Sequence, residues 1–229
     1  MKSVFCFLFT FLLLSYSGNL LSQEKAEEFD KVYGLDQLLY NGIKYTYFLP
    51  SGTGGNQYLI SPDYIKGDLT IREKTFNDVM LNYDIYNQQL LLQYVTGTGA
   101  LNVLEVSKAW LSSFKLGNMH FEYLDAGKES RFYQLLGDGP VRILYYWHKS
   151  LKLDMAYGTT NYTFSPAVKE TFILLNDKII PFGNKRGLLN IFEGEKRDKL
   201  KTYLSKYRIK LKKASDHMIA VLANYVSEL

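Results

Sequence analysis

The chain has 229 residues, with 27 Lys and Arg, 23 Asp and Glu and 3 His, and a formal net charge of +4 at pH 7. Aromatic residues make up 15% of it, including 19 Tyr and 14 Phe, which excludes an intrinsically disordered chain. A single Cys and only 5 Pro exclude a disulfide-stapled miniprotein, a zinc site built on thiolates and a collagen-like repeat.

The first 22 residues have the pattern of a secretory signal peptide. Lys2 gives a positive start, residues 4–16 are almost wholly apolar, and the small residue Ser22 precedes a polar stretch. The apolar run is shorter than the ~20 residues that a membrane-spanning helix needs. We therefore expect cleavage after Ser22 and export of a mature chain to the periplasm or the extracellular space, not as an integral membrane protein. Cys6 would leave with the leader, so the mature chain would be free of thiols.

After a lead-in segment at residues 23–42, residues 43–181 have a period of two. Apolar and polar side chains alternate at positions 79–85, 90–95 and 143–148, in runs rich in Tyr, Phe, Val and Ile. Such alternation is typical of strands. Short turn signals, such as Gly117 followed by Asn118, separate the runs. The sequence therefore predicts a mainly β domain: an antiparallel meander that forms a curved sheet, a barrel or a sandwich.

Residues 182–229 change to a helical period and predict a C-terminal helical segment packed on the β domain. A short helix is expected near Lys185, a second over residues 195–206, and a last amphipathic helix after Ser215, which can cap its first turn. Residues 208–212 alternate apolar and basic side chains and are expected to be extended. Because the chain ends in helices, and the strands carry charges on both faces, an outer-membrane barrel is disfavoured.

The helical segment is strongly basic. Residues 195–213 contain nine basic and two acidic residues, a net charge of +7. A patch for an anionic partner is one interpretation: lipid headgroups, a polysaccharide or another envelope protein. A solvated helix face is the other. A nucleic-acid partner is not expected in an exported chain. The residues proposed for the patch are Lys206, Arg208, Lys210, Lys212 and Lys213.

Tyrosines recur through the β region in a way that allows two interpretations. Rings on a concave sheet could contact a sugar or a peptide. They could equally fill the core, since Tyr suits a half-buried strand. The candidate contact residues are Tyr45, Tyr47, Tyr83, Tyr86, Tyr145 and Tyr146.

Signals for catalysis are weak, and no catalytic residue is assigned. His120 and Glu122 share one face of a strand and could hold a metal, although an ion pair is the more common outcome. A hydrolase could use two carboxylates from the β region, with Asp84, Glu122 and Asp154 as candidates. Residues 51–56 lack the Gly-Lys-Ser/Thr ending of a phosphate loop. We therefore expect neither a cofactor nor a metal.

Several short segments are familiar: LYNGIKY at 39–45, GDLT at 67–70, LNYDIYN at 81–87, LKTYL at 200–204 and LANY at 222–225. Through them the mature chain resembles a family of secreted proteins of Bacteroidota whose function is unknown. The resemblance implies an envelope or periplasmic location and gives no functional residues. The sequence thus favours a non-catalytic binding or interaction protein of the cell envelope. The alternatives are an envelope hydrolase and a barrel-type carrier of an apolar ligand.

Overall fold

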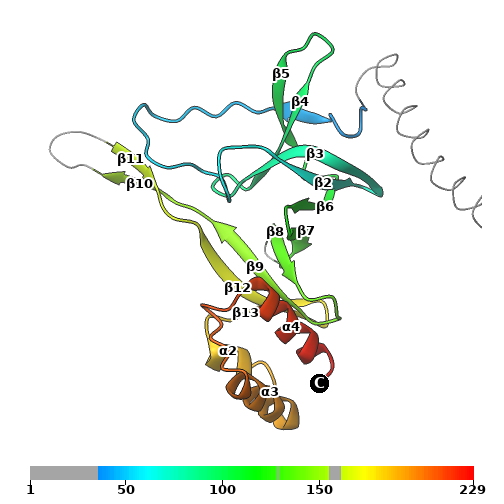
Figure 1. The fold of residues 1–229 in the computed structure, drawn as a ribbon, viewed down its shortest axis with the longest axis vertical. Helices are drawn as coiled ribbons and strands as arrows, with labels where there is room; N and C mark the ends of the chain where they lie inside the picture. The colour runs from blue at the N-terminus through cyan, green and yellow to red at the C-terminus, as the bar shows by residue number, and fades with distance from the viewer. Residues whose placement is uncertain (1–35, 128, 155–160) are drawn as a thin grey trace, which may run out of the picture.

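A computed structural model describes residues 36–127, 129–154 and 161–229, so the predicted signal peptide lies outside the described residues. The fold is mainly β: an 11-stranded antiparallel sheet followed by C-terminal helices, which confirms the predicted meander (Figure 1). The strands lie in the spatial order β1 (Gly42–Lys44), β5 (Leu101–Val106), β4 (Gln89–Val95), β3 (Lys74–Asp84), β2 (Ile65–Ile71), β6 (Leu111–Leu116), β7 (Met119–Asp125), β8 (Ser130–Leu136), β9 (Arg142–His148), β12 (Val168–Leu175) and β13 (Lys178–Pro181).

Two-residue turns set the register of several hairpins. Leu116 pairs with Met119 across Gly117 and Asn118, as the sequence predicts. Asn176 and Asp177, which join β12 to β13, both have positive φ, of 50° and 59°. Such a turn twists in the same sense as its strands, and Asn and Asp tolerate this backbone better than most residues.

The N-terminal part of the sheet curls strongly. The ring centroids of Tyr83 on β3 and Phe132 on β8 are 5.7 Å apart, although β2, β6 and β7 lie between these strands. On a flat sheet, four interstrand spacings would separate the two strands by about 19 Å. Tyr83 also meets Phe114 and Phe121 edge-on, at 5.3 and 5.4 Å. These rings fill the concave face and are the centre of the N-terminal core, whose buried members run from Leu39 to Phe132.

The curled sheet stays open. Among the described residues, its end strands β1 and β13 pair only with β5 and β12. Phe132 and Leu136 share one face of β8 but belong to different cores, so a single sheet buries both cores on the same face. Of the three forms that the sequence allowed, the curved sheet is observed, and the barrel is wrong because the sheet does not close.

A two-stranded ribbon extends β9 and β12 away from the sheet. β10 (Leu151–Asp154) pairs with β11 (Asn161–Phe164) and continues the hairpin, at the upper left of Figure 1. The segment before β2 reaches the outer edge of this ribbon. There Gly54 forms a parallel bridge with Thr163, and the Gly54 carbonyl accepts a hydrogen bond from the N–H of Phe164 at 3.0 Å.

Three helices follow the sheet: α2 (Lys185–Leu189), α3 (Gly194–Lys206) and α4 (Asp216–Ser227). They form the C-terminal core with the inner face of β8, β9 and β12, and α4 packs directly on β8 and β9 (Figure 1). Ser215 caps α4 as predicted, because its Oγ accepts a hydrogen bond from the N–H of Met218. The buried members of this core run from Leu136 to Val226.

The turn between β8 and β9 lets α4 approach closely. Gly137 has a φ of +99°, and a Cβ added there would lie 2.7 Å from the Cβ of Ala223. Glycine is therefore required on both conformational and steric grounds. At the end of the helix, the Ser227 Oγ accepts from the N–H of Val141 at 3.1 Å and donates to its carbonyl at 3.0 Å. These contacts fix the end of α4 against the sheet.

One local expectation is wrong. Residues 208–212 do not form an extended segment: Arg208 has a φ of +50°, and the N–H groups of Lys213 and Ala214 both donate to the Lys210 carbonyl. The apolar side chains that alternate there, Ile209 and Leu211, turn toward the C-terminal core instead. Two apolar residues in five are too few to distinguish a strand from a turn packed on a core.

Candidate functional site

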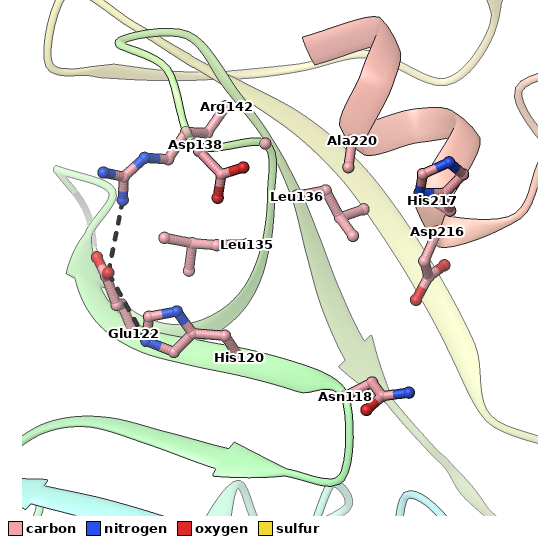
Figure 2. A pocket seen from close by; sticks show the side chains of 11 residues that line it. Asn118, His120, Glu122, Leu135, Leu136, Asp138, Arg142, Asp216, His217 and Ala220 are labelled. Carbon is pink, nitrogen blue, oxygen red and sulfur yellow. Dashed lines mark hydrogen bonds and ion pairs between the residues drawn. The ribbon is translucent and has the colours of Figure 1, made fainter. Parts of the chain in front are cut away.

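A cleft opens where β7 separates from β8. The two strands pair from Asp125 opposite Ser130 to Phe121 opposite Gln134 and then part, whereas β8 continues to pair with β9 through Leu136. The resulting cleft has a volume of about 630 Å³. Figure 2 shows that β7 forms one wall and the first turn of α4 the other. Its polar lining consists of Asn118, His120, Glu122, Asp138, Arg142, Asp216 and His217.

The β7 wall carries an ionic cluster. The Glu122 Oε1 lies 3.5 Å from the Arg142 Nη1 and 3.9 Å from the His120 Nε2 (Figure 2). Burial lowers the pKa of His120; Glu122 opposes this shift, and Lys115 and Arg142 add to it. His120 is therefore largely neutral near pH 7, so Arg142 is the main partner of Glu122. The sequence placed His120 and Glu122 on one strand face, and no metal-binding group of His, Cys, Asp or Glu occurs among the described residues.

The helix wall is tied to the sheet. The Asp216 Oδ2 accepts a hydrogen bond from the Gln134 Nε2 at 2.8 Å, and its Oδ1 lies 3.9 Å from the Lys169 Nζ. The Gln134 Oε1 in turn accepts from the Trp147 Nε1 at 2.7 Å. Asp216 is thus held by the inner face of the sheet, where it anchors the start of α4.

The chemistry available in this cleft is limited. Its described lining contains no Ser, Thr, Cys or Lys that could serve as a nucleophile. His120 is a neutral base with its nearest carboxylate beyond hydrogen-bonding distance. The other titratable groups of the cleft are Glu122, Asp138, Arg142, Asp216 and His217, which can hold a small polar group.

The carboxylates proposed for a hydrolase do not come together. Asp84 is completely buried on β3, and two strands lie between it and Glu122 on β7. Both side chains point away from the concave face, so at least three interstrand spacings, about 14 Å, separate them. Paired glycosidase carboxylates are about 5–9.5 Å apart. The side chain of Asp154 lies outside the described residues.

Asp84 instead has a structural role. Its Oδ1 accepts from the N–H groups of Tyr86 and Asn87 at 3.0 and 2.9 Å. Its Oδ2 accepts from the Tyr45 hydroxyl at 3.0 Å and from the Asn87 Nδ2 at 2.8 Å. The Gln57 Nε2 donates to the Tyr45 hydroxyl at 3.3 Å, and burial raises the pKa of Tyr45 far above its ordinary value. The carboxylate thereby fixes the segment before β2 against the outer face of the sheet.

The six candidate tyrosines separate into two groups. Tyr83 and Tyr145 are 0% and 1% exposed and lie in the two cores, which removes them from any surface contact. Tyr47 lies between Tyr45 and Tyr86 with ring centroids 6.4 Å from each, on the outer face.

Tyr146 also lies on the outer face but in a different place. Its ring is 6.2 Å from that of Tyr133, and the Arg131 guanidinium lies over it at 4.5 Å. The concave binding face expected from the sequence is therefore filled by core side chains, and the accessible candidate rings lie on the convex side.

The basic candidates are all accessible. Lys206, Arg208, Lys210, Lys212 and Lys213 are exposed, and in the part of the chain that the structure describes none of them forms an ion pair.

A group of tyrosines that the sequence did not single out lies beside these basic residues. Tyr203 stacks on Tyr225 with ring centroids 3.8 Å apart, and Tyr207 lies 4.6 Å from Tyr203. Lys206, Tyr203, Tyr207 and Tyr225 line a shared surface hollow. The helical spacing of Tyr203 and Tyr207 could have indicated this pair, but Tyr225 joins only through the packing of α4 on α3.

No described helix has the length and hydropathy needed to cross a membrane. Comparisons with protein-family models, with curated proteins and with solved structures gave no match.

Proposed function

We propose that the chain is a non-catalytic binding protein of the cell envelope, and that its helical end contacts an anionic partner. One observation carries the proposal: five exposed basic side chains in residues 206–213 have no acidic partner among the described residues. Unpaired like charges repel one another, so a compact group of them costs folding free energy unless a partner offsets it. The location rests on the leader-like N-terminus and on the resemblance to secreted proteins.

The surroundings of the basic residues favour lipid headgroups as the partner. Met218 and Val221 are 41% and 43% exposed, and their spacing places them on the same side of α4 as Tyr225. Tyr207 is 53% exposed and adjoins the same tyrosine stack. Basic residues beside tyrosines and exposed aliphatic side chains are typical of surfaces that lie on anionic bilayers.

Charge reversal tests this proposal. The mature chain, residues 23–229, should sediment with vesicles of phosphatidylethanolamine and phosphatidylglycerol, and binding should weaken as salt rises. Combining Lys206→Glu, Lys210→Glu and Lys213→Glu should weaken binding on the order of a hundredfold, since each basic residue near such a surface contributes about 1 kcal/mol. The salt dependence of the remaining binding should be flatter.

The matched control reverses three exposed lysines of the sheet, Lys44→Glu, Lys66→Glu and Lys178→Glu. It changes the net charge equally and should retain most of the vesicle binding. Equal losses in both triple variants would show that only net charge matters, and binding unchanged by either would remove the helical end as the contact surface. Competition with alginate distinguishes a polysaccharide partner from a lipid.

The fold bears differently on the other two functions. A barrel-type carrier needs a closed and hollow sheet, whereas this sheet is open and rings fill its concave face. A hydrolase that paired Asp84 with Glu122 would need them close together, and the sheet separates them; the side chain of the third candidate, Asp154, lies outside the described residues.

A further inference from the structure

β11 and β12 follow one another along one edge of the paired strands, and the chain covers this edge at both ends but leaves it open between them. At one end, Gly54 bridges Thr163. At the other, the N–H of Phe182 donates to the Thr171 carbonyl at 2.9 Å, and β13 pairs with the residues that follow. Within the described ranges, residues 166–170 have no backbone partner on this side. The open stretch is about 17 Å long, at 3.3 Å per residue.

The direction of the free backbone groups follows from the register. The Thr171 carbonyl points to this edge because it accepts from Phe182. Backbone groups of alternate residues point to the same side of a strand, so the N–H and C=O of Lys169 also face the edge. Neither group has a backbone partner among the described residues, since the pairing of β12 with β9 uses the opposite side. Lys169 therefore offers one backbone donor and one backbone acceptor in the geometry of an unpaired edge strand.

A groove runs beside this edge. Its volume is about 620 Å³, and Lys169, Thr171, Phe182, Gly183, Leu211 and Lys212 are among the residues that line it. Phe182 and Leu211 supply an apolar floor, and a Cβ added to Gly183 would meet nothing within 4 Å. The groove thus has room for side chains on one face of an added strand.

The groove offers one unpaired basic side chain. Lys212 is exposed and has no acidic partner in the described part of the chain. The Lys169 Nζ lies over the Tyr145 ring at 3.9 Å, and burial lowers the pKa of this lysine. Glu170 also lines the groove, and its Oε1 lies 3.3 Å from the His148 Nε2. The Lys169 Nζ already lies 3.9 Å from the Asp216 Oδ1, so Lys212 is the unpaired basic group that an acidic side chain in the groove would meet.

We propose that the open edge of β12 binds an extended, acidic peptide segment of a partner protein, which adds as a strand beside residues 166–170. Hydrogen bonds to the Lys169 backbone supply sequence-independent affinity, and side-chain contacts with Leu211, Phe182 and Lys212 supply selectivity. The end strands are a poorer template, because β1 and β13 are only three and four residues long and β13 ends in a proline. This groove shares Lys212 with the basic residues proposed for lipid, so the vesicle experiment leaves Lys212 unchanged.

A phage-displayed library of random octapeptides, panned against the mature chain, tests the proposal. The enriched peptides should carry Asp or Glu and alternate these with β-branched residues. Lys169→Pro removes the free N–H without removing a bond to β9, and prolines are tolerated at such edges. It should bind the enriched peptides at least about tenfold more weakly than Lys169→Ala, which keeps the N–H. Lys212→Glu should cause a similar loss, and the control Lys178→Glu none.

A second measurement does not depend on the proline variant folding. In the unmodified chain, a bound peptide should slow hydrogen exchange of the Lys169 amide, and methylation of alternate peptide nitrogens should abolish both protection and binding. Three outcomes would overturn the proposal: no enriched peptide, equal binding by Lys169→Pro and Lys169→Ala, or a Lys169 amide that exchanges equally fast in the complex.

Discussion

Replacement of Tyr83 by alanine should lower the free energy of unfolding by about 3–5 kcal/mol, the range expected for removing a large aromatic side chain from a core. Tyr83 is completely buried, and its ring contacts Phe114, Phe121 and Phe132 at centroid distances of 5.3 to 5.7 Å. These rings come from strands across the curl, so the cavity would weaken the curl itself. Urea titration followed by tryptophan fluorescence measures the change, because Trp110 and Trp147 both pack against this core.

Two variants make this result specific. Tyr83→Phe keeps the ring and removes only the hydroxyl, which donates to the Gln88 Oε1 at 2.6 Å, so we expect a loss of about 1 kcal/mol. Phe48→Ala removes a ring that is 89% exposed and should change stability by less than about 0.5 kcal/mol. A loss for Tyr83→Ala no larger than that for Phe48→Ala would refute the central role given to Tyr83.

Replacement of Asp84 by alanine should also cost about 3–5 kcal/mol, for a different reason. The change leaves the Tyr45 hydroxyl, the Asn87 side chain and two backbone N–H groups without their acceptor, and each such buried group costs about 1–3 kcal/mol. The segment before β2 should then detach, although Lys149 still donates to its carbonyls at Asn56 and Tyr58. Limited proteolysis should therefore cut this segment faster.

The control for this prediction is Asp63→Ala, an exposed aspartate of the same segment whose loss should have little effect. Asp84→Asn keeps one acceptor oxygen and should lie between the control and Asp84→Ala. If Asp84→Ala proved as stable and as resistant to proteolysis as Asp63→Ala, the carboxylate would have no anchoring role.

Local patterns predicted the elements of this fold well. The alternation of apolar and polar residues predicted the strands. Gly117 and Asn118 predicted a hairpin, and Ser215 predicted the start of the last helix. The curl could not be read in the same way. It depends on rings from β3 and β8 meeting across three intervening strands, and no spacing along the chain encodes that distance.

The candidate site was predictable only in part. Exposure of the basic residues follows from composition, and Tyr45, Tyr47 and Tyr86 do meet. The sequence could not separate these rings from Tyr83 and Tyr145, because alternation shows that two faces exist but not which one the core will occupy. The open edge of β12 could not be predicted from the sequence either. It depends on where the pairing of Gly54 with Thr163 and of Phe182 with Thr171 ends, and these contacts join segments far apart in the chain.

The division of the buried residues into two cores implies an order of assembly. Every buried member of the N-terminal core precedes Leu136, and every buried member of the C-terminal core follows Phe132. A chain that emerges from its N-terminus first can complete one core while the helices are still missing. During that interval Ile143, Tyr145 and Ile173 would present bare apolar surface, so the half-emerged chain has more need of a chaperone than the finished protein.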